Sequence, residues 1–249
     1  MNNFLLLSII IIIILVYFIG KSNERFLNTN IIKEYIKNTE NDRNIAMKGI
    51  DIKYYINFAF HYRLFNLFEI VVAELDKNNI NYFLICGGLI GYYRHNQGFI
   101  PWDGDIDIGV MEEDRNKLHE VINNLIKNDK HLNLAIHEID KILDGSFNNN
   151  PIQIDIFYFK FYPDKNYYDY YMNELIKMSP NEYLYKDEIY PLQTVSYILY
   201  DIYGNKFKEI NIKIPNKSKI YLDRAYKNWE NIKKPTHIHS DYYKLMHYI

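Results

Sequence analysis

The stretch that most constrains this chain is residues 105–110, DIDIGV, in which carboxylates alternate with branched apolar side chains. Such alternation predicts a β-strand, because successive side chains of a strand point to opposite faces. Asp105 and Asp107 then share one face, ~7 Å apart along the strand, while Ile106 and Ile108 enter a core. Left unpaired, the two carboxylates would raise each other's pKa and destabilise the sheet. The pattern therefore predicts a cation between them.

A third carboxylate, Asp155, lies in the apolar run 151–159, PIQIDIFYF. An acidic residue inside so apolar a strand is costly without a partner. If this strand lies beside residues 105–110, Asp105, Asp107 and Asp155 form a cluster that can hold two metals for phosphoryl chemistry. Oxygen-only ligands favour Mg²⁺ or Mn²⁺ over Zn²⁺.

A Gly-Gly pair, Gly87-Gly88, follows the apolar run 80–86, INYFLIC, and precedes a short helical segment. Glycines at a strand-to-helix turn let backbone N–H groups approach a phosphate, and the helix N-terminus adds a favourable field. Arg94 and His95 follow one or two turns later and could clamp phosphate oxygens. These four residues are the candidates for binding a phosphate-bearing cofactor or substrate.

Each feature also has a simpler explanation. An isolated Asp-x-Asp strand is more often a solvated edge, a Gly-Gly pair is usually only a turn, and Arg94-His95 could be a surface pair. Asp103 either ends the turn before the strand or joins the metal site, and both alternatives stay open. The order of the pieces (strand, Gly-Gly, short helix, Asp-x-Asp strand, later Asp strand) is nevertheless the pattern of the nucleotidyltransferase superfamily. We therefore expect one site rather than unrelated features.

The remaining pattern predicts one mixed α/β domain with a mixed sheet. Apolar residues at helical spacing predict helices at 52–77 and 112–128, and apolar runs predict strands at 131–139 and 151–159. The stretch between them, 143–151, LDGSFNNNP, is expected to be a loop. A strand at 209–215 and a helix at 218–229, with Ser218 as its N-cap, complete the prediction.

The N-terminus has a different character. Residues 4–20, FLLLSIIIIIILVYFIG, are uncharged and almost entirely apolar. A helix of that length is on the order of 25 Å long, enough for a thin bilayer. We predict a single-pass signal-anchor over residues 1–20, a polar stalk over 21–50 and the catalytic domain over 51–249. A cleaved signal peptide is the alternative, although no basic n-region or small-residue cleavage site is evident.

The net charge argues against one class of binding partner, and the cysteine content excludes internal disulfides. The formal net charge of -2 argues against a nucleic-acid partner, which would require a basic face. A single cysteine, Cys86, permits no internal disulfide.

Residues 81–110, NYFLICGGLIGYYRHNQGFIPWDGDIDIGV, resemble the LicD family, whose hallmark is a Gly-rich turn, an Arg-His pair and then an IPWDDDIDIG-type run. The matching positions are Gly87, Gly91, Arg94, His95, Gly98, Phe99, Ile100, Pro101, Trp102, Asp103, Asp105, Ile106, Asp107, Ile108 and Gly109. The resemblance extends to Asp155 and, more loosely, to the C-terminus. Two positions depart from the family pattern: Gly104 stands where a third consecutive Asp is common, and Gly88 stands where Thr is usual.

The resemblance implies a phosphotransferase on the nucleotidyltransferase fold. Members include bacterial enzymes that move phosphocholine from CDP-choline onto surface glycans. The fukutin-type relatives are membrane-anchored and move ribitol phosphate from CDP-ribitol onto a glycan in the Golgi. It thus implies a Mg²⁺ (or Mn²⁺) cofactor, a CDP-linked donor and a glycan acceptor.

By the same resemblance, Asp105 and Asp107 would bridge the metals to the donor phosphates. Asp155 would complete the metal site and help to activate the acceptor hydroxyl. A nucleotidyltransferase that adds an NMP to its acceptor is one alternative function. A membrane-tethered glycan-binding protein with a decayed site is another.

The side of the membrane on which the domain lies stays open. Lys21 and Arg25 follow the span and favour a cytoplasmic domain. A glycosylation sequon at Asn216 and the likeness to Golgi-anchored relatives favour the lumenal side.

Overall fold

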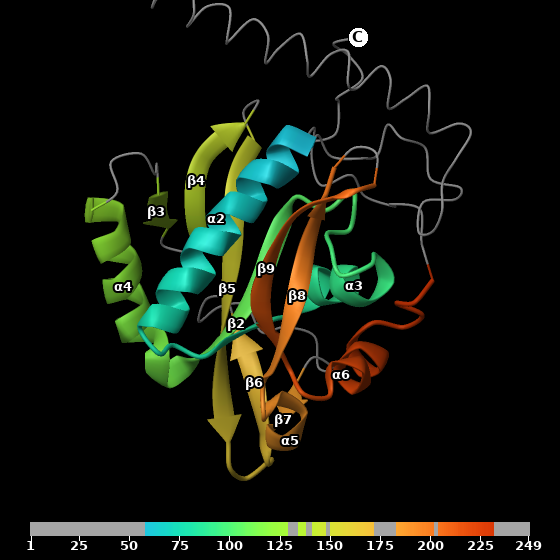
Figure 1. Ribbon diagram of the computed structural model, residues 1–249. Coiled ribbons are helices and arrows are strands. Elements are labelled where there is room, and N and C mark those ends of the chain that lie inside the picture. The colour runs from blue at the N-terminus through green and yellow to red at the C-terminus, as the bar shows by residue number, and fades with distance from the viewer. Residues whose placement is uncertain are drawn as a thin grey trace, which may run out of the picture. The chain divides into compact units, whose positions relative to one another are not determined.

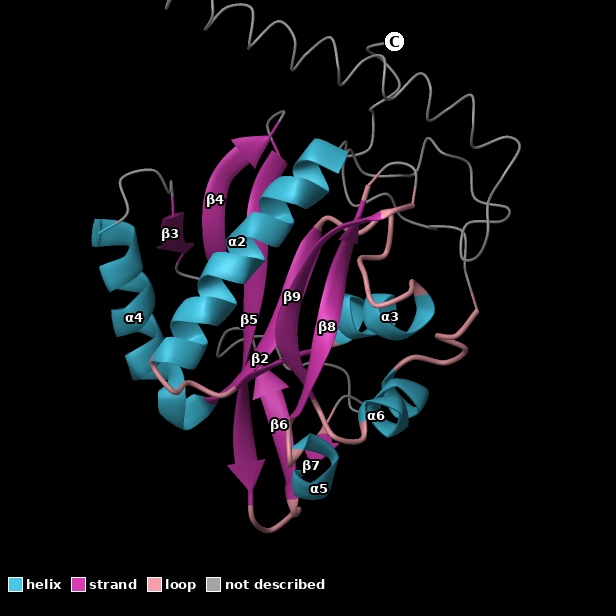
Figure 2. Ribbon diagram, viewed as in Figure 1, coloured by secondary structure: helices cyan, strands magenta, loops and turns pink. Residues whose placement is uncertain are grey.

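A computed structural model describes residues 58–128, 134–137, 141–147, 150–171, 183–201 and 204–231 (Figures 1 and 2). The elements in chain order are α2 (Phe58–Lys77), β1 (Tyr82–Leu84), α3 (Cys86–Arg94), β2 (Asp105–Met111), η2 (Glu112–Asp114), α4 (Arg115–Asn128), β3 (Leu134–His137), β4 (Lys141–Phe147), β5 (Asn150–Tyr162), β6 (Tyr167–Tyr171), β7 (Leu184–Tyr185), α5 (Lys186–Ile189), β8 (Gln193–Tyr200), β9 (Lys206–Ile214) and α6 (Ser218–Ala225). The predicted mixed α/β class is confirmed.

The larger sheet brings the two aspartate-bearing strands side by side. Its order is β1-β2-β5-β4-β3, with β6 paired to β5 and β7 to β6. Strands β2 and β5 are parallel, whereas the other described pairs of this sheet are antiparallel. Strands β4 and β6 pair with successive parts of β5, so both occupy its edge opposite β2. A second sheet consists of the antiparallel hairpin β8-β9.

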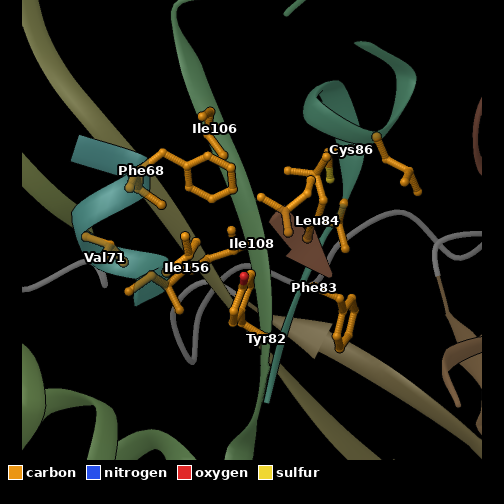
Figure 3. Packing of buried hydrophobic residues seen from close by; sticks show 14 of the residues in the cluster. Phe68, Val71, Tyr82, Phe83, Leu84, Cys86, Ile106, Ile108 and Ile156 are labelled. Carbon is orange, nitrogen blue, oxygen red and sulfur yellow. The ribbon is translucent and has the colours of Figure 1, made fainter. Parts of the chain in front are cut away.

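Helix α2 covers the apolar face of the larger sheet. Its inward residues are Leu64, Phe68, Val71 and Leu75, all fully buried. In Figure 3, Ile106, Ile108 and Ile156 lie on the same side of the strands as Phe68 and Val71. The isoleucines of β2 and β5 are fully buried as well. The alternating pattern therefore places its apolar half in the core and leaves its carboxylates on the opposite face.

Two local predictions are wrong. The stretch expected to be a loop from residue 143 is instead part of β4, which continues to Phe147 and pairs with β5. An irregularity in register between Leu143 and Ser146 lets the strand absorb its turn-forming residues. Ser218 is also not the N-cap of α6: Lys217 takes that position, and the Ser218 hydroxyl donates to the carbonyl of Pro215.

The predicted anchor over residues 1–20 and stalk over 21–50 lie outside the described residues. Among the helices that the structure describes, none combines the length and apolar character needed to cross a membrane.

Candidate metal centre

The three carboxylates predicted to cluster meet where β2 and β5 run in parallel. Asp107 faces Asp155 across the strand pair, and Asp105 lies two residues earlier on the same face of β2. One carboxylate oxygen from each of the three lies within 4.8 Å of the oxygens of the other two. The prediction that the two strands are neighbours is confirmed.

This donor set fits a hard divalent ion. All three ligand atoms are carboxylate oxygens, which Mg²⁺, Mn²⁺ and Ca²⁺ prefer. Ca²⁺ bonds oxygens at about 2.3–2.6 Å and joins oxygens up to about 5 Å apart, whereas Mg²⁺ at about 2.0–2.1 Å joins oxygens up to about 4.2 Å apart. The three oxygens lie within 4.8 Å of one another, so they span a Ca²⁺-sized ion as they stand, and Mg²⁺ or Mn²⁺ would draw the carboxylates slightly closer together.

Asp103 adds a fourth carboxylate to the cluster. Its backbone N–H donates to the carbonyl of Ile100 at 2.9 Å, so the residue does end the turn before β2. Burial, followed by the charge and hydrogen bond of Asp105, raises the pKa of Asp103 well above its ordinary value. Burial and the charges of Asp105, Asp155 and Asp103 do the same to the pKa of Asp107. The protein without a cation therefore carries like-charge repulsion that a bound divalent ion would relieve.

The first turn of α3 faces this cluster. The backbone N–H of Gly87 donates a hydrogen bond to the Asp107 carboxylate, and the Ile85 N–H donates to the Asp107 carbonyl at 3.1 Å. A Cβ atom on Gly87 would lie 2.4 Å from Oδ2 of Asp103 and 3.9 Å from Oδ2 of Asp107. Only glycine leaves room for both carboxylates, so position 87 is part of the site.

Gly88 faces the other way. A Cβ atom there would lie 2.7 Å from Cδ1 of Leu84, in the core. Its missing side chain allows α3 to approach β1 closely, and its N–H is what it can offer to a ligand.

Arg94 is held by the C-terminal part of the domain. Its Nη1 donates to the carbonyls of Trp229 at 2.9 Å and Asn231 at 3.2 Å, and its Nε donates to Nε2 of His95 at 2.9 Å. Within the described residues its Nη2 has no acceptor. The guanidinium also acts electrostatically on Asp103, lowering that carboxyl's pKa against the larger effect of burial. Arg94 thus joins α3 to the segment after α6 and borders the carboxylate cluster.

His95 is buried beside Arg94 and Trp102. Burial and the charge of Arg94 lower the pKa of His95 to about 3, so the ring is neutral. Its Nε2 accepts from Arg94, so its proton lies on Nδ1, which has no partner among the described residues. The ring meets that of Trp102 edge to face at 5.4 Å.

Sequence reasoning missed His61 on α2. It is buried, and its Nε2 lies 2.9 Å from the backbone carbonyl oxygen of Asp103. Burial lowers the pKa of His61 to about 4, so this ring too is neutral. In the sequence, His61 is only a polar ring within an otherwise apolar helical pattern. That pattern does not indicate which residue the ring contacts, and the contact is 42 residues away.

These two histidines predict that the metal-free protein loses stability in mild acid. Each has a folded-state pKa, about 4 for His61 and about 3 for His95, below the ordinary value of 6.5. Below about pH 6.5 the unfolded chain binds more protons, so each histidine removes about 2 kcal/mol of unfolding free energy between pH 7 and pH 5. The raised pKa values of Asp103 and Asp107 change the unfolding free energy in the opposite direction. The overall pH dependence of the unfolding free energy is therefore a poor test of the histidines.

The test is the difference between the wild type and His95→Gln in denaturant unfolding at both pH values. We expect the variant to lose about 2 kcal/mol less than the wild type between pH 7 and pH 5. Equal losses would contradict a buried neutral His95.

Known proteins of similar sequence support a family assignment. A model of the family described as "LicD/FKTN/FKRP, nucleotidyltransferase domain" matches residues 79–217. An uncharacterized protein of Rickettsia typhi is 30% identical over 190 residues, which make up 76% of this chain and 53% of that protein. An uncharacterized protein of Rickettsia prowazekii is 28% identical over 179 residues, or 72% of this chain and 59% of that protein. The chain thus spans little more than half the length of these relatives.

Proposed function

The chain belongs to the LicD family, and from this membership and its carboxylate cluster we propose a metal-dependent transferase. It would move a phospho-alcohol group, such as phosphocholine or ribitol phosphate, from a CDP-activated donor to a glycan hydroxyl. The observation that carries the proposal is the set of three carboxylate oxygens within 4.8 Å of one another on β2 and β5.

The proposed roles follow from the positions of the side chains. Asp105, Asp107 and Asp155 would hold Mg²⁺ or Mn²⁺. When bound, such an ion would neutralise the donor phosphates and stabilise charge in phosphoryl transfer. The carboxylate of Asp155 would also help to take the proton of the acceptor hydroxyl as its oxygen bonds to phosphorus and the bond to CMP breaks.

The donor phosphates would bind beside the first turn of α3. The N–H groups at a helix N-terminus favour an anion, which supports the proposed role of Gly88. The N–H of Gly87 already donates to the Asp107 carboxylate, so Gly87 would serve the donor by leaving room beside the carboxylates. Arg94 keeps Nη2 for a phosphate oxygen, since the carbonyls of Trp229 and Asn231 engage Nη1. His95 would offer Nδ1–H, the buried donor that lacks a partner among the described residues. Catalysis would then consist mainly of positioning and charge neutralisation.

Donor turnover tests the proposal. The full chain, supplied with Mg²⁺, a mixed glycan acceptor and either CDP-choline or CDP-ribitol, should release CMP. Asp107→Ala should abolish this release, and EDTA should do the same to the wild type. CMP release that persists in Asp107→Ala would refute the assignment.

The description of the family domain as a nucleotidyltransferase domain favours a second candidate, a nucleotidyltransferase that attaches an NMP. The same carboxylates would serve an NTP donor. Release of pyrophosphate from an NTP, with no CMP from either CDP donor, would favour this reaction.

We also propose that the N-terminal segment is a membrane anchor. An apolar helix over residues 1–20 would tether the domain to a membrane and bring it near membrane-borne glycoconjugates. Which side of the membrane the domain faces would follow from protease protection of the tethered domain in sealed vesicles.

A further inference from the structure

His61 joins helix α2 to the turn that carries Asp103. Its Nε2 lies 2.9 Å from the Asp103 carbonyl oxygen. A carbonyl oxygen only accepts hydrogen bonds, so the neutral ring must carry its proton on Nε2. The ring also stacks on Phe99, with centroids 4.7 Å apart and planes 6° from parallel. Phe99 meets the ring of Tyr197 edge to face at 5.5 Å, so the imidazole is held by the core.

The hydrogen bond fixes one peptide group next to the site. In a trans peptide the C=O and the following N–H point in opposite directions. The carbonyl of Asp103 points to His61, and the N–H of Gly104 donates to the Asp103 carboxylate. Holding the carbonyl therefore also aims the N–H that orients this carboxylate toward Asp105.

This support matters because of Gly104. Glycine restricts its own backbone less than any other residue does. Here it joins Asp103 to Asp105, the first residue of β2. A side chain from outside the segment can supply the restriction that glycine does not.

We propose that His61 is a positioning residue for the metal site, acting by holding the Asp103–Gly104 peptide from α2. The inference deepens the proposed function, on which it rests for the role of the cluster. His61 lies outside the segment that matches the family, residues 79–217. Among the described residues, the polar group that His61 contacts is the backbone carbonyl of Asp103.

A matched pair of variants isolates the hydrogen bond. Gln and Met have similar length and both lose the stacking on Phe99, but Gln retains an N–H donor and Met does not. Calorimetric titration of the full chain with Mg²⁺ alone should show a dissociation constant about tenfold higher for His61→Met than for His61→Gln, since supporting groups of metal sites typically contribute 10–100-fold. The apparent KM for Mg²⁺ in CMP release should rise in parallel, with kcat at saturating Mg²⁺ largely retained.

A second measurement needs no metal. Nitrogen-15 spectra of the wild type at pH 7 should show a neutral His61 with its proton on Nε2.

For the Mg²⁺ titration, His119→Phe is the control, because it removes a comparable contact, Nε2 to the Tyr158 hydroxyl at 3.0 Å, on a different helix. We expect it to leave Mg²⁺ binding unchanged.

The outcomes separate this role from the proposed function. Equal Mg²⁺ affinities for His61→Gln and His61→Met overturn the positioning role, as does a proton on Nδ1, even if the wild type releases CMP. A wild type that binds no Mg²⁺ overturns it as well. A His61-dependent affinity in a protein that releases no CMP supports the positioning role and rejects the transfer reaction.

Discussion

Asp107→Asn is expected to abolish activity while making the metal-free protein more stable. The carboxylate of Asp107 is desolvated and lies among the charges of Asp105, Asp155 and Asp103, which together raise its pKa. A carboxyl group whose pKa is raised in the folded state opposes folding increasingly as the pH rises above its ordinary value of 3.8, and fully above the raised value. Asn keeps the shape and removes the charge.

The expected sizes differ between the two effects. Removing one metal ligand forfeits several kcal/mol of transition-state stabilisation, so turnover should fall by at least about a thousandfold. Relief of the repulsion should raise the unfolding free energy by about 1 kcal/mol, or roughly 2–4 °C in Tm. The gain should shrink as the pH falls, because the wild-type carboxyl then takes up a proton.

Thermal unfolding with EDTA and with Mg²⁺ measures both consequences. Mg²⁺ should raise the Tm of the wild type, because it binds only the folded state, but not that of Asp107→Asn. Asp187→Asn is the matched control. Asp187 is an exposed carboxylate paired with Lys217, and its loss should give no gain in Tm and an unchanged response to Mg²⁺. A lower Tm for Asp107→Asn in EDTA would show that the carboxylates support the fold rather than strain it.

Ala at positions 87 and 88 should separate function from stability in two adjacent residues. In Gly87→Ala the new Cβ would lie 2.4 Å from Oδ2 of Asp103, so this oxygen must move by about 1 Å to reach ordinary contact at 3.4 Å. A carboxylate can rotate, so the fold survives, and Ala favours a helix more than Gly does. Asp103 is hydrogen-bonded to the proposed metal ligand Asp105, so its displacement would shift the site, and a misplacement of about 1 Å costs about a hundredfold in rate.

Gly88→Ala should show the reverse. Its Cβ would press on Leu84 in the core, 2.7 Å from Cδ1, and overpacking typically costs about 1–3 kcal/mol. The N–H of residue 88 and the carboxylates stay in place. We therefore expect a lower Tm with Mg²⁺ affinity within about twofold of the wild type.

Turnover, Mg²⁺ affinity and Tm of the two variants provide the comparison. A Gly87→Ala protein with normal turnover would mean that the position of the Asp103 carboxylate does not matter to the reaction. A Gly88→Ala protein with normal Tm but poor turnover would place that residue's importance in the site rather than in the core.

Several features could be predicted from the sequence because they are local. Alternation in residues 105–110 sets which side chains of β2 share a face, and helical spacing of apolar residues locates α2 and α4. The strand 143–147 could not be predicted, since its turn-forming residues favour a loop and only pairing with β5 makes them a strand. Ser218 likewise has the residue type of an N-cap, but in the fold its hydroxyl donates to the carbonyl of Pro215.

The sequence by itself determined that Asp105 and Asp107 share one face of β2 and that Asp155 lies on the face of β5 opposite its isoleucines, because side-chain direction in a strand depends only on position along it. Only the tertiary structure decided that β2 and β5 pair in a register that sets Asp107 opposite Asp155. It also decided that Arg94 reaches the carbonyl of Trp229, 135 residues away, and that His61 reaches that of Asp103. Contacts at such separations form where buried polar groups find partners as the chain packs, and they leave no periodic trace in the sequence.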